Sequence, residues 1–223
     1  VYKSQVLGGR MMEKMANLDD VQDYIDQNYW ALENNVILID EFLQNAKEVD
    51  VDVLRDNQGN TMIAGIMEHI EEAGIHSGDS ACSIPPFSLD DKIISDIKKF
   101  SISLVNELKI LGLMNIQYAI KDGEIFILEA NPRASRTIPF LAKAIGIPFI
   151  KIAAELIVGK ILTEKYQNFD NNTLPYFAIK EAVFPFNKFP NTDVILGPEM
   201  KSTGEVMGID AVSYTHLTLP TSR

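Results

Sequence analysis

The chain has 223 residues and 46% of them are hydrophobic, enough for one large domain or two small lobes around a core. Its net charge of -11 argues against a basic surface that binds nucleic acid, and no apolar run or signal peptide indicates a membrane or export. The single cysteine, Cys82, excludes an internal disulfide and fits a reducing compartment, so we expect a cytoplasmic protein.

Helical and strand patterns alternate along the chain and predict an α/β (α+β) fold. In chain order we expect a helix at 19–28, strands at 35–43, 48–54 and 61–70, a long helix at 90–111, two strands within 112–137, and helices at 138–145 and 149–158. Ser88 is expected to cap the long helix, and Gly112 to end it. Its apolar stripe should be core: Ile93, Ile97, Phe100, Leu104, Leu108 and Leu111.

The strand at 48–54 alternates between acidic residues and valine up to residue 53. Its valines should face a core, and Glu48, Asp50 and Asp52 should face outward or toward a ligand, with both aspartates solvated. Asp56 to Asn60 then forms a turn.

The segment at 112–137, GLMNIQYAIKDGEIFILEANPRASRT, predicts a hairpin because Asp122-Gly123 separates two apolar runs. Glu129 and Asn131 share one face of the second strand. A two-residue loop would put Gln117 on the opposite face from Glu129. A three-residue loop, from residue 121 to 123 with glycine left-handed, would put both on one face, and we favour it.

A carboxylate and two amide oxygens on one sheet face are hard ligands that suit magnesium between nucleotide phosphates. The alternative is a polar cluster that ends an edge strand. Arg133 and Arg136 follow directly, and planar guanidinium groups suit phosphate or carboxy-phosphate recognition. Such a pair alone more often forms a structural ion pair, but beside the Gln/Glu/Asn trio the functional interpretation is favoured.

Three segments resemble the large subunit of carbamoyl phosphate synthetase, within one of its two ATP-grasp modules: GIMEHIEEAGIHSGDSACSIPP, ILEANPRASRT and PFNKFPNTDVILGPEMKSTGEVMG. The resemblance runs from about Val6 to Ile209, and LGGRMME with HSGDSACS is similar to the C-terminal half, which phosphorylates carbamate. It implies an ATP-grasp fold with the nucleotide between two lobes, ATP and Mg²⁺ (or Mn²⁺) as cofactors, and carbamoyl phosphate as product. It also implies the rest of the large subunit and a glutaminase small subunit as partners, in arginine or pyrimidine biosynthesis.

The resemblance also assigns roles to residues. For the nucleotide it implies a glycine loop at Gly8 and Gly9, adenine contacts at Glu41 and Leu43, a ribose contact at Glu48, and further contacts at Gly74, Ile75, His76 and Ser77. For the metal it implies Gln117 and Glu129, which would also contact ATP, with Asn131 completing one site. Arg133 and Arg136 would orient the acceptor and stabilise phosphoryl charge. The family's arginine before the glycine loop is missing, because Tyr2, Lys3 and Ser4 occupy that tripeptide.

We expect a partial small lobe with the glycine loop and hinge at 1–65, a large lobe with the metal and phosphate site at 66–210, and a foreign-looking tail at 211–223. One alternative is another ATP-grasp ligase, such as a biotin carboxylase-like or amino-acid ligase module, which usually carries an acidic residue where Gln117 stands. Another is a truncated, non-catalytic piece that binds nucleotide weakly. As an isolated piece the chain should have weak activity or none.

Overall fold

The computed structural model describes residues 13–32, 39–167, 169, 174–188 and 194–211. Its elements are α1 (Leu18–Gln27), α2 (Tyr29–Leu32), β1 (Lys47–Arg55), β2 (Thr61–Glu72), β3 (Cys82–Ile84), α3 (Asp91–Glu107), β4 (Gly112–Lys121), β5 (Glu124–Asn131), α4 (Ile138–Ile145), α5 (Phe149–Ile157), α6 (Glu164–Gln167), β6 (Phe177–Val183), a 3-10 turn (Phe186–Lys188) and β7 (Gly204–Asp210). No helix in these residues is long and apolar enough to cross a membrane.

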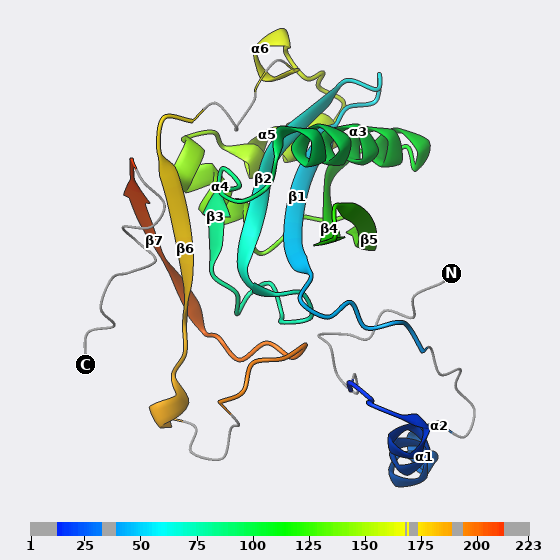
Figure 1. The fold of residues 1–223 in the computed structure, drawn as a ribbon. Coiled ribbons are helices and arrows are strands. Elements are labelled where there is room, and N and C mark those ends of the chain that lie inside the picture. The colour runs from blue at the N-terminus through cyan, green and yellow to red at the C-terminus, as the bar shows by residue number, and fades with distance from the viewer. Residues whose placement is uncertain (1–12, 33–38, 168, 170–173, 189–193, 212–223) are drawn as a thin grey trace.

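The strands form a seven-stranded sheet in the order β5-β4-β1-β2-β3-β6-β7, and every neighbouring pair is antiparallel (Figure 1). Helix α3 covers one face of the sheet, whereas α4 and α5 cover the other. The valines of β1 point toward α3, as their alternation predicts, and are fully buried. Strand β1 is therefore central and buried on both faces, because its acidic positions are covered as well.

The expected strands at 48–54 and 61–70 and the helices at 19–28, 138–145 and 149–158 are confirmed within a few residues. The expected strand at 35–43 is not: residues 39–43 have no regular structure, and 35–38 lie outside the described residues. The expected boundary between residues 65 and 66 falls inside β2. Gly8, Gly9 and residues 212–223 also lie outside the described part.

Helix α3 differs from the prediction at both ends. Its N-cap is Asp90, whose carboxylate accepts a hydrogen bond from the Ile93 amide at 2.7 Å, whereas the Ser88 hydroxyl bonds the Glu68 carboxylate. The helix ends at Glu107, and Lys109 two residues later has a positive φ of 51°. Of the predicted apolar stripe, Ile93 and Ile97 belong to the core and Leu104 packs against it. Phe100, Leu108 and Leu111 are 41%, 52% and 42% exposed.

The β4–β5 hairpin has a different loop from the predicted one, but Gln117 and Glu129 lie on the same face, as predicted. Lys121 pairs with Glu124, so the loop has the two residues Asp122 and Gly123, with φ values of 52° and 80°. Our three-residue loop was wrong, because both residues adopt the left-handed conformation of a tight hairpin turn. A β-bulge between Gln117 and Tyr118 shifts the register by one residue and pairs Gln117 directly with Glu129. Directly paired residues share a face, so this part of the prediction is confirmed.

Candidate functional site

Two rows of polar residues cross the three strands β1, β4 and β5 on the face that also carries α4. Asp50 pairs with Gln117, which pairs with Glu129. In the adjacent row Asp52 pairs with Asn115, which pairs with Asn131. Within the described residues, the side chains of Gln117 and Glu129 make no hydrogen bond, and both are partly exposed. Their oxygen atoms are therefore available to a cation or to a ligand.

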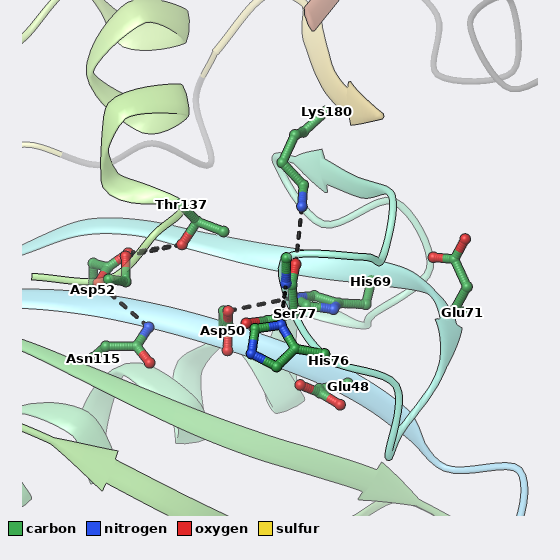
Figure 2. A network of polar contacts seen from close by, with 12 residues as sticks. Glu48, Asp50, Asp52, His69, Glu71, His76, Ser77, Asn115, Thr137 and Lys180 are labelled. Carbon is green, nitrogen blue, oxygen red and sulfur yellow. Dashed lines mark hydrogen bonds and ion pairs between the residues drawn. The ribbon is translucent and has the colours of Figure 1, made fainter. Parts of the chain in front are cut away.

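Asp52 is the most enclosed member of these rows. It is completely buried, and Ser135 Oγ donates to its Oδ2 at 2.8 Å. Asn115 Nδ2 donates to Oδ1 at 3.3 Å, and Thr137 Oγ1 lies 3.5 Å from Oδ2 (Figure 2). Burial, and then repulsion from Asp50, raise the pKa of Asp52 to about 7, although the three hydrogen bonds act in the opposite direction. The expectation that Asp50 and Asp52 are solvated was wrong, because the loop before α4 and the neighbouring strands cover them.

A second acidic cluster lies at the start of β1. The carboxylates of Glu48 and Asp50 and the ring of His69 offer one ligand atom each, all within 4.8 Å of one another, and all three residues are buried. His69 Nε2 lies 3.5 Å from Asp50 Oδ2 (Figure 2). Burial alone would lower the pKa of His69, but the adjacent Asp50 and Glu48 carboxylates raise it overall. The 3.5 Å separation of His69 Nε2 and Asp50 Oδ2 makes these two residues an ion pair when the ring is protonated.

The loop at 74–79 closes one edge of the polar face. The Gly74 amide donates to Glu48 Oε2 at 3.3 Å, and its φ of 107° needs glycine. The side chain of His76 is held by the Gly78 amide, which donates to Nδ1 at 3.0 Å. The neutral ring of His76 therefore carries its proton on Nε2. Burial, followed by the nearby positive charge of Arg136, lowers the pKa of His76.

The segment at 197–202 packs against this loop and against the arginine loop. Asp79 Oδ2 accepts from the Lys201 amide at 2.8 Å, and Asp79 Oδ1 accepts from the Ser202 amide at 2.9 Å. Arg136 contacts the Met200 sulfur. The folded chain therefore brings together three segments that are far apart in the sequence: 74–79, 133–137 and 197–202.

Lys180 on β6 is a buried cation that the sequence analysis missed. It is 1% exposed, and its Nζ donates to the Ser77 carbonyl at 2.9 Å (Figure 2). Its positive charge also acts on His69 and His76, where it opposes protonation. A lysine in a strand gives no signal of burial in the sequence, because lysine usually lies at the surface. The structure thus adds a fixed positive charge behind the loop.

The remaining predicted residues are placed as follows. Arg133 is exposed, and its guanidinium donates to the Ala134 carbonyl at 3.2 Å. Glu41 is exposed and Leu43 is partly exposed, in the irregular segment before β1. A surface cavity of about 570 Å³ lies elsewhere, between the start of β1, the start of α3 and the β4–β5 turn. None of the predicted site residues that the structure describes lines it.

Known proteins are similar in sequence to this chain over most of its length. Residues 1–165 match the family described as "Carbamoyl-phosphate synthase L chain, ATP binding domain". The chain therefore belongs to the carbamoyl phosphate synthase large-chain family. It is 52% identical over 217 residues to the large chain from Nostoc sp. (95% of this chain, 20% of the relative) and 54% identical over 210 residues to that from Archaeoglobus fulgidus (94% and 19%). The chain thus spans about a fifth of the length of these relatives.

Solved structures support the ATP-grasp fold. Biotin carboxylase from Campylobacter jejuni, in complex with β,γ-ATP, matches with a TM-score of 0.65 at 17% identity, over 79% of this chain and 40% of that one. The biotin carboxylase domain of 2-oxoglutarate carboxylase from Hydrogenobacter thermophilus, solved with MgADP and bicarbonate, matches with a TM-score of 0.62 at 15% identity, over 78% and 39%. These likenesses show the fold, and the family match identifies residues 1–165 as part of an ATP-binding domain.

Proposed function

We propose that this chain is part of the second ATP-grasp module of a carbamoyl phosphate synthetase, and that the complete module phosphorylates carbamate with MgATP. The observation that carries the proposal is the direct pairing of Gln117 with Glu129, on one face with Asn131. These residues offer oxygen donors beside a loop that bears two arginines. The family match to an ATP-binding domain supports ATP as the phosphoryl donor.

The proposed metal site fits the residues that are present. Gln117 and Glu129 would hold magnesium, and Asn131 would complete one site, since all three offer the hard oxygen ligands that Mg²⁺ prefers. Bound magnesium would neutralise phosphate charge. Manganese accepts the same ligands. Glu129 is only partly buried, so its carboxylate would be accessible to a cation that also binds the nucleotide phosphates.

The reaction would be a direct phosphoryl transfer. A carbamate oxygen forms a bond to the γ-phosphorus of ATP as the bond to the β–γ bridging oxygen breaks, which gives carbamoyl phosphate and ADP. Arg136 and Arg133 would orient the acceptor and stabilise the charge that develops on the transferred group. No side chain would form a covalent intermediate. Catalysis would consist of positioning and of charge neutralisation.

The nucleotide itself would lie along the 74–79 loop. Glu48 would accept hydrogen bonds from the ribose hydroxyls, and the Gly74 amide holds its carboxylate at the loop. Backbone groups of Glu41 and Leu43 would contact adenine, and the loop at Gly8 and Gly9 would cover the phosphates. In this proposal nitrogen comes from ammonia or from the glutamine that a separate small subunit hydrolyses.

The test uses a complete large chain that carries these residues and measures ATP formed from carbamoyl phosphate and MgADP. Glu129→Ala should abolish the reaction while circular dichroism and melting stay close to wild type. Glu124→Ala is the matched control, because Glu124 is an exposed carboxylate at the other end of the same strand. Equal activity of Glu129→Ala and wild type would exclude the metal assignment. A bicarbonate-dependent ATPase that makes no carbamoyl phosphate would instead indicate another ATP-grasp ligase.

A further inference from the structure

Asp52 connects the central strand to the loop that carries the arginines. Residues 52 and 135 are far apart in sequence, yet Ser135 Oγ donates to Asp52 Oδ2 at 2.8 Å. The same hydroxyl accepts a hydrogen bond from the Ile138 amide at 3.1 Å and lies 2.9 Å from Thr137 Oγ1. One carboxylate oxygen therefore fixes the end of the loop and the first turn of α4 together.

Arg136 lies between the two residues that Asp52 holds. Ser135 and Thr137 are 9% and 1% exposed, and both hydroxyls point inward to the carboxylate. Arg136 is exposed and extends the other way, toward His76 and Met200 on the far side of the site. With both neighbours fixed, the backbone at Arg136 has little freedom, and the direction of its side chain follows from theirs.

The other carboxylate oxygen reaches the second polar row. Asn115 donates to Asp52 Oδ1 at 3.3 Å, and Asn115 pairs across the strands with Asn131. Asn131 is the last residue of β5, and the arginine loop starts immediately after it. Asp52 therefore holds both ends of the loop from 132 to 137, one end directly and the other through the strand pairing.

We propose that Asp52 is a positioning residue, which anchors the 132–137 loop to β1 so that Arg136 is aimed at the transferred phosphoryl group. This inference rests on the proposed function for the role of Arg136. The anchoring itself rests only on the hydrogen bonds of Asp52.

A purely structural role explains a buried carboxylate less well. Burial of a carboxylate is costly even when hydrogen bonds compensate, and apolar residues of similar size often give equal or greater stability. Asp52 pairs with Gly65 of β2, and the Leu141 side chain of α4 lies close to Gly65. An apolar side chain at position 52 would therefore have an apolar neighbour. What an apolar residue at 52 cannot do is accept a hydrogen bond from Ser135.

The experiment compares variants of the complete large chain in ATP formation from carbamoyl phosphate and MgADP, with kcat and KM measured separately. Asp52→Ala should lower kcat by about tenfold or more, and the KM for MgADP should change by less than about threefold. Asp52→Asn retains an oxygen that accepts from Ser135 and should restore kcat to within about threefold of wild type. Ser135→Ala should lower kcat like Asp52→Ala, and the two changes combined should not add.

Ser101→Ala is the matched control. Ser101 is, like Ser135, a buried serine whose hydroxyl has a side-chain partner, Tyr118 at 2.8 Å, but on the opposite face of the sheet. Its loss should lower the melting temperature and leave kcat unchanged. Amide hydrogen exchange of residues 132–137, which requires no reaction, should become faster in Asp52→Ala and in Ser135→Ala.

Wild-type kcat in folded Asp52→Ala, additive effects of Asp52→Ala and Ser135→Ala, or unchanged exchange of the loop would each overturn the proposal. If Asp52→Ala fails to fold, the test relies on Ser135→Ala. The proposal would be overturned if Ser135→Ala lowered kcat no more than the control Ser101→Ala does. A wild-type chain that forms no ATP from carbamoyl phosphate would refute the proposed function. The exchange measurement would then still test the anchor by itself.

Discussion

The buried carboxyl of Asp52 predicts how stability changes with pH. Its pKa is raised from 3.8 to about 7, mainly because the group is fully buried and then because Asp50 is near. Between these two values the folded chain holds a proton that the unfolded chain has released. The free energy of unfolding must therefore fall as the pH rises from 4 to 7, and it should level off above the folded pKa.

The magnitude follows from the size of the shift. Each unit of pKa shift corresponds to about 1.4 kcal/mol, so a shift of about 3 units corresponds to roughly 4 kcal/mol between the acidic and the alkaline limits. Asparagine has nearly the same shape and does not ionise. Asp52→Asn should therefore gain stability relative to wild type as the pH rises, by about 2 kcal/mol between pH 5 and pH 7.

Chemical denaturation at pH 5, 6, 7 and 8 measures this directly, with wild type and Asp52→Asn compared at each pH. The comparison cancels the contributions of other titrating groups, such as His69, to the extent that the substitution leaves them unchanged. A difference in unfolding free energy that is independent of pH would refute the reasoning. The reasoning would also be refuted if wild type gained stability relative to Asp52→Asn as the pH rises, which is the behaviour of a carboxyl with a lowered pKa.

Three further predictions concern single residues. Arg136→Ala should lower turnover far more than ATP affinity, because its contact matters most as phosphoryl charge develops, and a change in melting temperature alone would favour an ion-pair role. Asp56→Ala should destabilise the chain by about 3 kcal/mol in denaturant titrations, since the carboxylate accepts from four nitrogen atoms of the described chain. Burial alone would raise the pKa of Asp56, but these hydrogen bonds lower it, so its contribution is present above the unfolded value of 3.8 and is lost as the pH falls through the folded pKa. Gly65→Ala should cost about 1–3 kcal/mol, because a Cβ there would lie 2.2 Å from Leu141 Cδ2, and the additional substitution Leu141→Ala should remove that clash.

Local patterns in the sequence were sufficient for most elements. The valine alternation of β1 identified its buried face, and the helical spacing at 138–145 and 149–158 identified α4 and α5. The end of α3 was missed because apolar residues continue at helical spacing beyond Glu107, although the backbone turns at Lys109. Periodicity records which face is apolar and does not record where the backbone changes direction.

The candidate site was predicted only where its residues are close in sequence. Gln117, Glu129 and Asn131 lie within one hairpin, so alternation could place them, but the compensating bulge between Gln117 and Tyr118 left no signal in the residue types. Asp52 and Lys180 were missed as buried groups because their partners, Ser135 and the Ser77 carbonyl, are distant in the chain. Only tertiary contacts reveal such groups, because the sequence alone presents a charged residue in a strand as a solvated one.

The two faces of the sheet differ in how completely their buried polar groups are satisfied. On the α3 face, Glu68 accepts from the Phe87 and Ser88 amides, and Ser101 bonds Tyr118. On the opposite face and its loop, within the described residues, Asp50 Oδ1, His69 Nδ1 and Ser80 Oγ are buried without a hydrogen-bond partner, and His69 Nε2 has only its 3.5 Å ion-pair contact with Asp50.

Each such atom costs about 1–3 kcal/mol, and buried polar atoms in proteins are nearly always paired. Asp50, one of the residues with such an atom, pairs with Gln117 in the polar row that continues to Glu129. A polar ligand that supplies the missing partners would recover this free energy on binding. This asymmetry supports the proposed placement of the ligand on the Asp50 side of the sheet, independently of any sequence motif.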